Sequence, residues 1–108
     1  MLVRIRLLGG FAVEGSDGRP VGLPTRKAAA LLAVLASRPG ATYTRERLAA
    51  LLWSQSGEAQ ARGSLRQALA HVRKALAAAG CDAAVQESRG EGLRLVADGR
   101  VEVDVAHP

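Results

Sequence analysis

Aromatic side chains are scarce in this chain of 108 residues, which contains one Phe, one Trp and one Tyr. Proteins that bind single-stranded nucleic acids without sequence preference stack the bases on aromatic side chains. The shortage of such side chains argues against that class of binder. Because 48% of the residues are hydrophobic and only 3% are aromatic, the sequence predicts a core of aliphatic side chains.

Cysteine and histidine are also rare. Cys81 is the single cysteine, and His71 and His107 are the two histidines. No intrachain disulfide can form, and no Cys/His cluster has the spacing of a metal site. The residue spacing indicates no Ser/His/Asp or Cys/His set for nucleophilic catalysis. We therefore expect a non-enzymatic protein without a metal or cofactor, in a reducing compartment.

Long hydrophobic runs are absent. The apolar residues at the N-terminus are interrupted by Arg4 and Arg6, so this segment does not resemble a secretory signal. No other segment approaches the roughly 18 apolar residues of a membrane span. The sequence therefore predicts a cytoplasmic protein that does not contact a membrane.

The charge is unbalanced, with 15 Lys and Arg against 10 Asp and Glu and a formal net charge of +5. A basic chain fits an anionic partner such as nucleic acid. The length predicts one domain over residues 1–108. Changes in hydrophobic periodicity divide it into an N-terminal sheet (1–24), three helices (25–80), and a hairpin with a last strand (84–105).

Two short strands are predicted at the start of the chain. Val3, Ile5 and Leu7 alternate with polar residues, and Phe11 and Val13 repeat the pattern after a glycine pair. These strands should be antiparallel. A tight turn at residues 16–18 then leads to residues 21–23, which we expect to close the sheet as a third strand.

Three helices are expected next. The first has Thr25 as its N-cap and runs to about Ser37. An extended linker over residues 41–43 leads to the second helix, for which Thr44 is the cap and Trp53, expected to fill the core, is the end.

The third helix should cover residues 59–79. Ser56 is a possible cap, and Gly80 has the position of a C-terminal glycine. One helical face carries Leu65, Leu69, Val72 and Leu76. The opposite face gathers Gly63, Gln67, Ala70 and Lys74, flanked by Arg66 and Arg73. Such a helix can rest on a small core and enter the DNA major groove, which is wide enough to admit it.

Gly63 is unusual because glycine in a helix interior costs about 1 kcal/mol relative to alanine. Two explanations remain open. The missing side chain allows either a close approach to phosphate or close packing of the second helix.

The last part of the chain alternates again. Residues 85–88 and 93–96 predict two strands joined by a turn at residues 89–92. A hairpin that follows a helix-turn-helix is a wing, and Arg89 at its tip can contact the minor groove or a phosphate. Val101, Val103 and Val105 share one face of a final strand.

Two sequence patterns resemble a known family. Residues 72–76 (VRKAL), 85–86 (VQ) and 89–95 (RGEGLRL) are similar to the VRKAL and VQTVRGxGYRL signature of OmpR/PhoB-type winged-helix domains. Four segments resemble the SARP type, in which such a domain precedes a bacterial transcriptional activator domain. They are LLGGFAV (7–13), GRPVGL (18–23), ERLAALLW (46–53) and ARGSLRQAL (61–69).

The resemblance implies an α+β winged helix-turn-helix with an N-terminal antiparallel sheet, three helices and a C-terminal hairpin wing. It also implies sequence-specific binding of double-stranded DNA at promoter direct repeats, as a possible tandem dimer. The loop over residues 53–60 would face RNA polymerase. The implied DNA-facing residues are Arg62, Ser64, Arg66, Gln67, Ala70, His71 and Arg73 of the helix and Arg89 of the wing.

The residue types suggest a division of roles. Arg66 and Gln67 are suited to reading bases, because Arg can pair with guanine and Gln with adenine through two hydrogen bonds. Phosphate contacts are expected from Arg62, Arg73, Lys74 and Arg89. For His71, a phosphate contact and simple solvation both remain open. An alternative function is docking of a protein on the same helix face, although Ala70 is the only residue of that face that fits it.

The sequence departs from the family pattern at three places. Leu93 replaces the usual Tyr or Phe, which we interpret as tolerated packing. Ala70 stands where many members have Arg, so fewer polar contacts are expected there. The chain ends near Val105, where these regulators continue into a second domain, and this suggests a part of a longer regulator.

Overall fold

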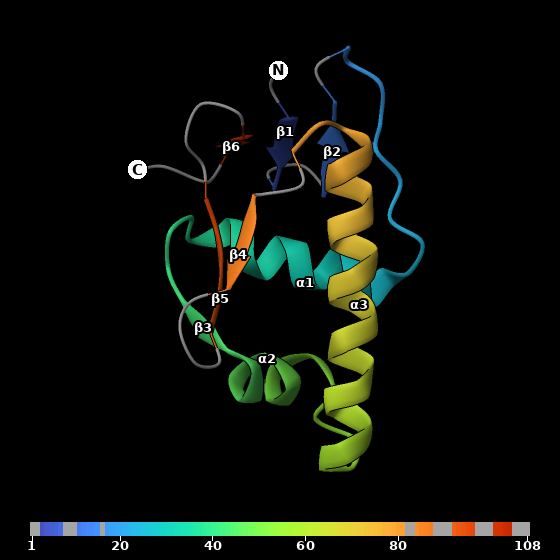
Figure 1. Ribbon diagram of the computed structural model, residues 1–108, viewed down its shortest axis with the longest axis vertical. Coiled ribbons are helices and arrows are strands. Elements are labelled where there is room, and N and C mark those ends of the chain that lie inside the picture. The colour runs from blue at the N-terminus through green and yellow to red at the C-terminus, as the bar shows by residue number, and fades with distance from the viewer. Residues whose placement is uncertain are drawn as a thin grey trace.

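A computed structural model describes residues 3–7, 11–15, 17–81, 84–87, 92–96 and 101–104 of the chain. Within these ranges, the helix α3 stands upright along one side, α1 crosses it, and α2 lies beside its first turns (Figure 1). The elements are β1 (Val3–Arg6), β2 (Ala12–Glu14), α1 (Arg26–Ser37), β3 (Tyr43–Thr44), α2 (Arg45–Leu52), α3 (Glu58–Ala78), β4 (Val85–Glu87), β5 (Gly92–Leu95) and β6 (Val101–Asp104).

Both predicted N-caps of the first two helices are confirmed. The Thr25 hydroxyl accepts a hydrogen bond from the Ala28 N–H at 3.0 Å, and the Thr44 hydroxyl accepts one from the Arg47 N–H at 3.0 Å. Each bond satisfies a donor that the first helical turn leaves without a partner. Trp53 caps the C-terminal end of α2, as predicted, and packs partly buried against the core.

The third helix covers Glu58–Ala78, one residue earlier at each end than the predicted range of 59–79. Ser56 is not its cap: the N-cap is Gly57, which has no side chain to accept a hydrogen bond. The predicted end at Gly80 is confirmed, since this glycine has a φ of +84°. The Cys81 and Gly80 N–H groups donate to Leu76 and Ala77 carbonyls at 2.8 and 2.9 Å, which is the Schellman motif.

The first sheet has the strand order β2-β1-β6. The antiparallel pairing of β1 with β2 is confirmed, with Ile5 opposite Val13. The prediction of a third strand at residues 21–23 is wrong. Pro20 forms only an isolated bridge with Glu14, and a proline has no N–H to extend a ladder. The third strand is instead β6, which pairs parallel to β1 with Val101 opposite Val3.

The second sheet contains the predicted hairpin. Strands β4 and β5 are antiparallel, with Gln86 opposite Arg94, and the linker segment contributes β3 as a third strand on β5. The hairpin turn, which includes Arg89, lies outside the described residues. The wing is therefore joined to the start of α2 through β3.

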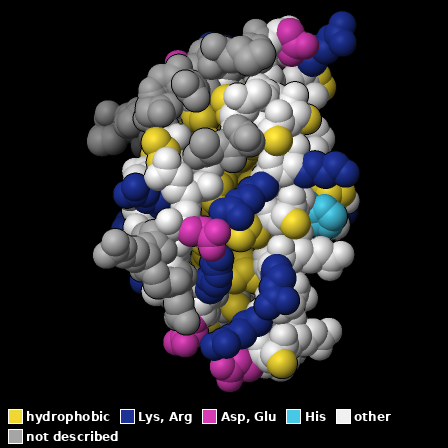
Figure 2. Space-filling model, in the orientation of Figure 1, with side chains coloured by type: hydrophobic (Ala, Val, Ile, Leu, Met, Phe, Trp, Pro, Cys, Tyr) yellow, Lys and Arg dark blue, Asp and Glu magenta, His cyan; other side chains and the backbone are white. Residues whose placement is uncertain are grey.

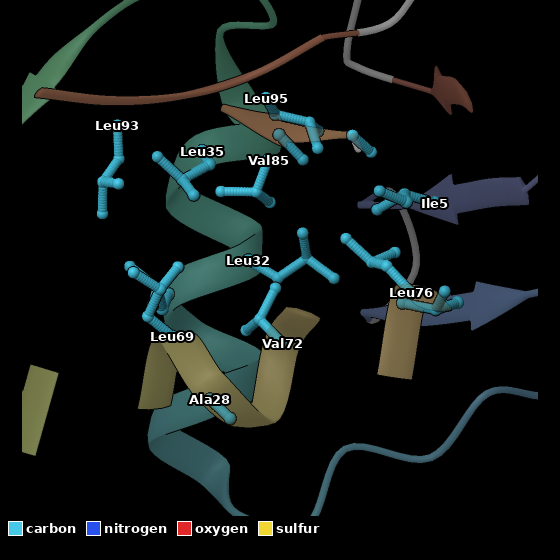
Figure 3. Close-up of a cluster of buried hydrophobic side chains, with 14 of the residues drawn as sticks. Ile5, Ala28, Leu32, Leu35, Leu69, Val72, Leu76, Val85, Leu93 and Leu95 are labelled. Atoms are coloured by element: carbon cyan, nitrogen blue, oxygen red, sulfur yellow. The ribbon is translucent and has the colours of Figure 1, made fainter. Parts of the chain in front are cut away.

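One aliphatic core connects the helices to both sheets (Figure 3). Leu32 and Leu35 of α1 meet Leu69 and Val72 of α3, with the hairpin strands at one end of the cluster and β1 at the other. The four predicted core residues of α3 are all buried. Leu93 is 0% exposed, which confirms that leucine packs where the family usually has an aromatic residue.

Candidate nucleic-acid interface

The two faces of α3 differ as predicted. Its apolar residues point into the core, and its opposite side lies at the surface. The exposed residues include Arg62, Gly63, Arg66, Gln67, Ala70 and Lys74. Ser64, His71 and Arg73 are partly buried at the edges of this surface. The structure thus brings together eight of the nine predicted site residues, and the ninth, Arg89, lies outside the described residues.

A recess separates the start of α2 from α3. Its lining combines the side chains of Arg45, Glu46, Arg62, Leu65, Arg66 and Leu69. Arg45 was missed in the sequence, although its place directly after the cap Thr44 was a signal that it lies in the first turn of a helix. Its Nη1 atom is buried without a hydrogen-bond partner among the described residues. The recess therefore offers guanidinium groups from two helices to an anion.

Glu87 at the end of β4 joins both helices to the wing. Its Oε2 atom accepts a hydrogen bond from Arg73 Nη2 at 3.2 Å, and its Oε1 atom accepts one from Arg45. The hydrogen bond from Arg73, followed by the positive charge of Arg45, lowers the pKa of the Glu87 carboxyl below its ordinary value. Sequence reasoning missed this contact, because Glu87 is distant along the chain from both arginines.

The opposite flank of α3 carries a second recess. It is lined by Thr25, Lys27, Trp53, Ser64, Gln67, Ala68 and His71. The Lys27 ammonium lies 5.7 Å from the centroid of the Trp53 ring and donates a hydrogen bond to the Leu52 carbonyl. The positively charged Lys27 side chain of α1 therefore lies beside α3, on the side away from Arg45.

The cations around α3 differ in their pairing. Arg62 Nη2 lies 3.5 Å from Glu58 Oε1 one turn earlier in the helix, and Arg73 is held by Glu87. Within the described ranges, Arg66 and Lys74 have no ion pair. Figure 2 shows Lys and Arg side chains gathered on this face around a strip of hydrophobic atoms. The surface is therefore basic, and the side chains of Arg66 and Lys74 are free to reach a partner.

Other kinds of site find little support in the part of the chain that the structure describes. No group of three His, Cys, Asp or Glu side chains there could hold a metal ion. None of the described helices combines the length and the apolar character that crossing a bilayer requires. The largest exposed hydrophobic side chain in these ranges is Leu51 of α2, which is 55% exposed and is not part of α3.

Comparisons with known proteins assign the chain to a family. Residues 18–95 match the family described as "Transcriptional regulatory protein, C terminal". The chain is similar to EmbR of Mycobacterium tuberculosis, whose structure was solved in complex with a low-affinity phosphopeptide, with 27% identity and a TM-score of 0.78. The match covers 92% of this chain and 26% of EmbR, so the chain spans about a quarter of that protein. No curated protein matches the chain.

The matched segment contains all three helices and the hairpin, and the three-helix α+β architecture agrees with a winged helix. The similarity to EmbR, a SARP-type regulator, supports the more specific resemblance. The chain belongs to the family of OmpR/PhoB-type C-terminal DNA-binding domains of transcriptional regulators.

Proposed function

We propose that the chain binds double-stranded DNA sequence-specifically, with α3 in the major groove. The observation that carries this proposal is the exposed face of α3, where Arg66 and Gln67 stand beside a basic surface while the opposite face is anchored in the core. A major groove about 12 Å wide admits a helix whose diameter with side chains is about 10–12 Å. The family membership supports DNA as the partner.

Arg66 and Gln67 read base edges in this proposal. Both side chains are exposed, and Arg66 is held by no carboxylate among the described residues. A two-hydrogen-bond contact to the correct base contributes about 1–3 kcal/mol of discrimination. Ser64, Ala70 and His71 lie on the same helix and contact the groove walls or the bases next to it.

Phosphates are held on both sides of the helix. Arg45 and Arg62 meet one strand through the recess between α2 and α3, which both side chains line. Lys74 lies further along α3 and contacts the phosphate backbone of the DNA. Arg89 of the wing reaches a phosphate or the minor groove, a role that follows from its place in the sequence. These contacts position the domain without specifying sequence.

Arg73 has a double role in the proposal. Its guanidinium is already oriented by Glu87, so it does not lose side-chain freedom when DNA binds. It can share its remaining N–H groups with a phosphate, because a guanidinium carries five donors. Glu87 thereby keeps the wing and α3 in the relative position that the groove requires.

A surface next to α2 would serve a second partner. A recess beside α2 is lined by Glu46, Ala49, Ala50, Trp53, Ser54, Ser56, Glu58, Ala61 and Arg62, and Leu51 is exposed elsewhere on the same helix. The recess is where the resemblance places the contact with RNA polymerase, over residues 53–60. We include that contact in the proposal, since this recess is lined by residues of that loop, including the partly buried Trp53, and aromatic side chains are enriched at protein interfaces.

The wider role follows the family. The proposed protein is a non-enzymatic cytoplasmic regulator whose 108 residues act as one DNA-binding domain. Two copies would bind side by side on direct repeats in a promoter. Docking of a protein on α3 is the competing function, and the basic, amide-bearing character of its exposed face favours DNA over that alternative.

The test is selection of binding sites from random duplex DNA with the purified 108-residue chain. The proposal predicts enrichment of a short motif, repeated at a spacing of about one helical turn. The selected duplex should bind at least about a thousandfold more tightly than a scrambled duplex at the same salt concentration. Binding that is weak, strongly salt-dependent and equal for both duplexes would contradict sequence-specific recognition.

A further inference from the structure

Gly63 occupies an interior position of α3, where no backbone feature requires it. Glycine is the least favourable residue after proline in a helix interior, because it loses the most conformational freedom. The glycines with positive φ among the described residues are Gly18, Gly40 and Gly80, so Gly63 has ordinary helical geometry. Any residue other than proline could adopt this backbone conformation.

Packing within the protein does not require the glycine either. Apart from its chain neighbours and the backbone of the same helix, a Cβ atom added at Gly63 would have no heavy atom of the described residues within 4 Å. Of the two explanations that the sequence left open, the close packing of α2 is therefore wrong. The space that a side chain would occupy is open to a partner.

The surroundings of Gly63 indicate which partner this is. Its neighbours Arg62 and Arg66 line the recess shared with Arg45, while Ser64 and Gln67 line the recess shared with Lys27. Gly63 is thus the position without a side chain between two recesses that both contain cationic residues. It lies three and four residues before Arg66 and Gln67, which is one turn away on the same side of the helix.

Resting on the proposed function, we infer that Gly63 lets the α3 backbone come into van der Waals contact with DNA inside the major groove. The diameter of a helix with its side chains nearly equals the groove width, so even a methyl group at this point opposes full insertion. The close approach allows Arg66 and Gln67 to reach the base edges. Gly63 is therefore an affinity-determining position, although it supplies no side chain.

Gly63→Ala tests the inference because stability and binding should change in opposite directions. The substitution improves helix propensity in open space, so the melting temperature should rise by about 4 °C. The dissociation constant for the selected duplex should increase by at least about tenfold, which corresponds to the loss of one close contact. The dissociation constant for a scrambled duplex should change less, because a non-specific complex does not need full insertion.

Ala77→Gly is the matched control. Ala77 is exposed near the C-terminal end of the same helix and lies outside the proposed contact. This variant should lower the melting temperature and leave the dissociation constant within about twofold of the original value. Together the two variants separate helix stability from fit in the groove.

Two results would overturn the inference, and its failure can be distinguished from failure of the proposed function. Gly63→Ala with unchanged affinity for the selected duplex would show that the position makes no close contact. A lower melting temperature would show that the space is not open. If Arg66→Ala lost affinity while Gly63→Ala did not, only the inference about Gly63 would fail. If the unmodified chain selected no motif, the proposed function itself would fail.

Discussion

Glu87 and Arg73 link the wing to the recognition helix through a hydrogen bond of 3.2 Å between Oε2 and Nη2. The same carboxylate also accepts a hydrogen bond from Arg45, the first residue of α2. One side chain at the end of β4 thus connects three elements of the proposed DNA-binding surface. Both arginines hold the pKa of this carboxyl below its ordinary value of 4.5.

This contact predicts a pH dependence of stability. Because the pKa of Glu87 is lower in the folded protein, the unfolded chain binds the proton first as the pH falls. The contribution of Glu87 is complete above the ordinary pKa and is lost as the pH falls through the lowered value. Glu87→Gln should therefore reduce the melting temperature at pH 7, and the difference from the original protein should disappear in acid.

Thermal melts of both proteins between about pH 7 and about pH 3 measure this difference. Glu46→Gln is a suitable comparison, since Glu46 is exposed and has no ion pair among the described residues. A constant difference between Glu87→Gln and the original protein at every pH would contradict the electrostatic explanation.

Lys27 of α1 is predicted to stabilise the packing of α1 against the C-terminal end of α2. Lys27→Ala removes the hydrogen bond to the Leu52 carbonyl and the interaction with the Trp53 ring. We expect a loss of about 1 kcal/mol in the free energy of unfolding, because both contacts are partly exposed to solvent. Urea unfolding of the variant and the original protein measures this loss of stability. Arg26→Ala, at the exposed neighbouring position, should cost less than about 0.5 kcal/mol, and equal losses for the two variants would argue against the Lys27 contacts.

The core and the exposed apolar surface should respond differently to truncation. Leu32 is fully buried between α1 and α3, and Leu32→Ala should cost about 2–5 kcal/mol. Leu51→Ala should cost less than about 0.5 kcal/mol, since Leu51 is 55% exposed. A stability loss at Leu51 similar to that at Leu32 would show that Leu51 is needed for the fold rather than available to a partner.

The wing prediction concerns the salt dependence of DNA binding. Arg89→Ala should weaken binding to selected and scrambled duplexes by a similar factor. The slope of log affinity against log salt should decrease by about one unit for each lost phosphate contact. Titrations at several salt concentrations measure the slope. A change confined to the selected duplex would instead assign base recognition to Arg89.

The helix ends and the buried face of α3 could be predicted from the sequence, because each depends on residues that are close together along the chain. Thr25 and Thr44 precede helices that need an acceptor at the first turn, and Gly80 supplies the backbone conformation that ends α3. The apolar spacing from Leu65 to Leu76 also defined the exposed face on which the site residues lie. Eight of the predicted site residues flank or occupy this face because helical periodicity is regular.

Long-range pairing could not be predicted in the same way. The alternation in Val101 and Val103 predicts a strand but does not identify β1 as its parallel neighbour. The sequence likewise gives no sign that Tyr43 pairs with Leu93 and brings Arg45 close to the wing. The contacts of Glu87 depend on this arrangement, so the polar network behind the site appears only in three dimensions.

The proposed function depends above all on the reading of base edges by the exposed face of α3. The most direct measurement repeats the selection from random duplex DNA with Arg66→Ala and compares its motif with that of the original chain. Arg66→Ala should bind with lower affinity and lose the preference at one base position, with the rest of the motif retained. An identical motif bound with identical affinity would contradict the assignment of α3 to the major groove.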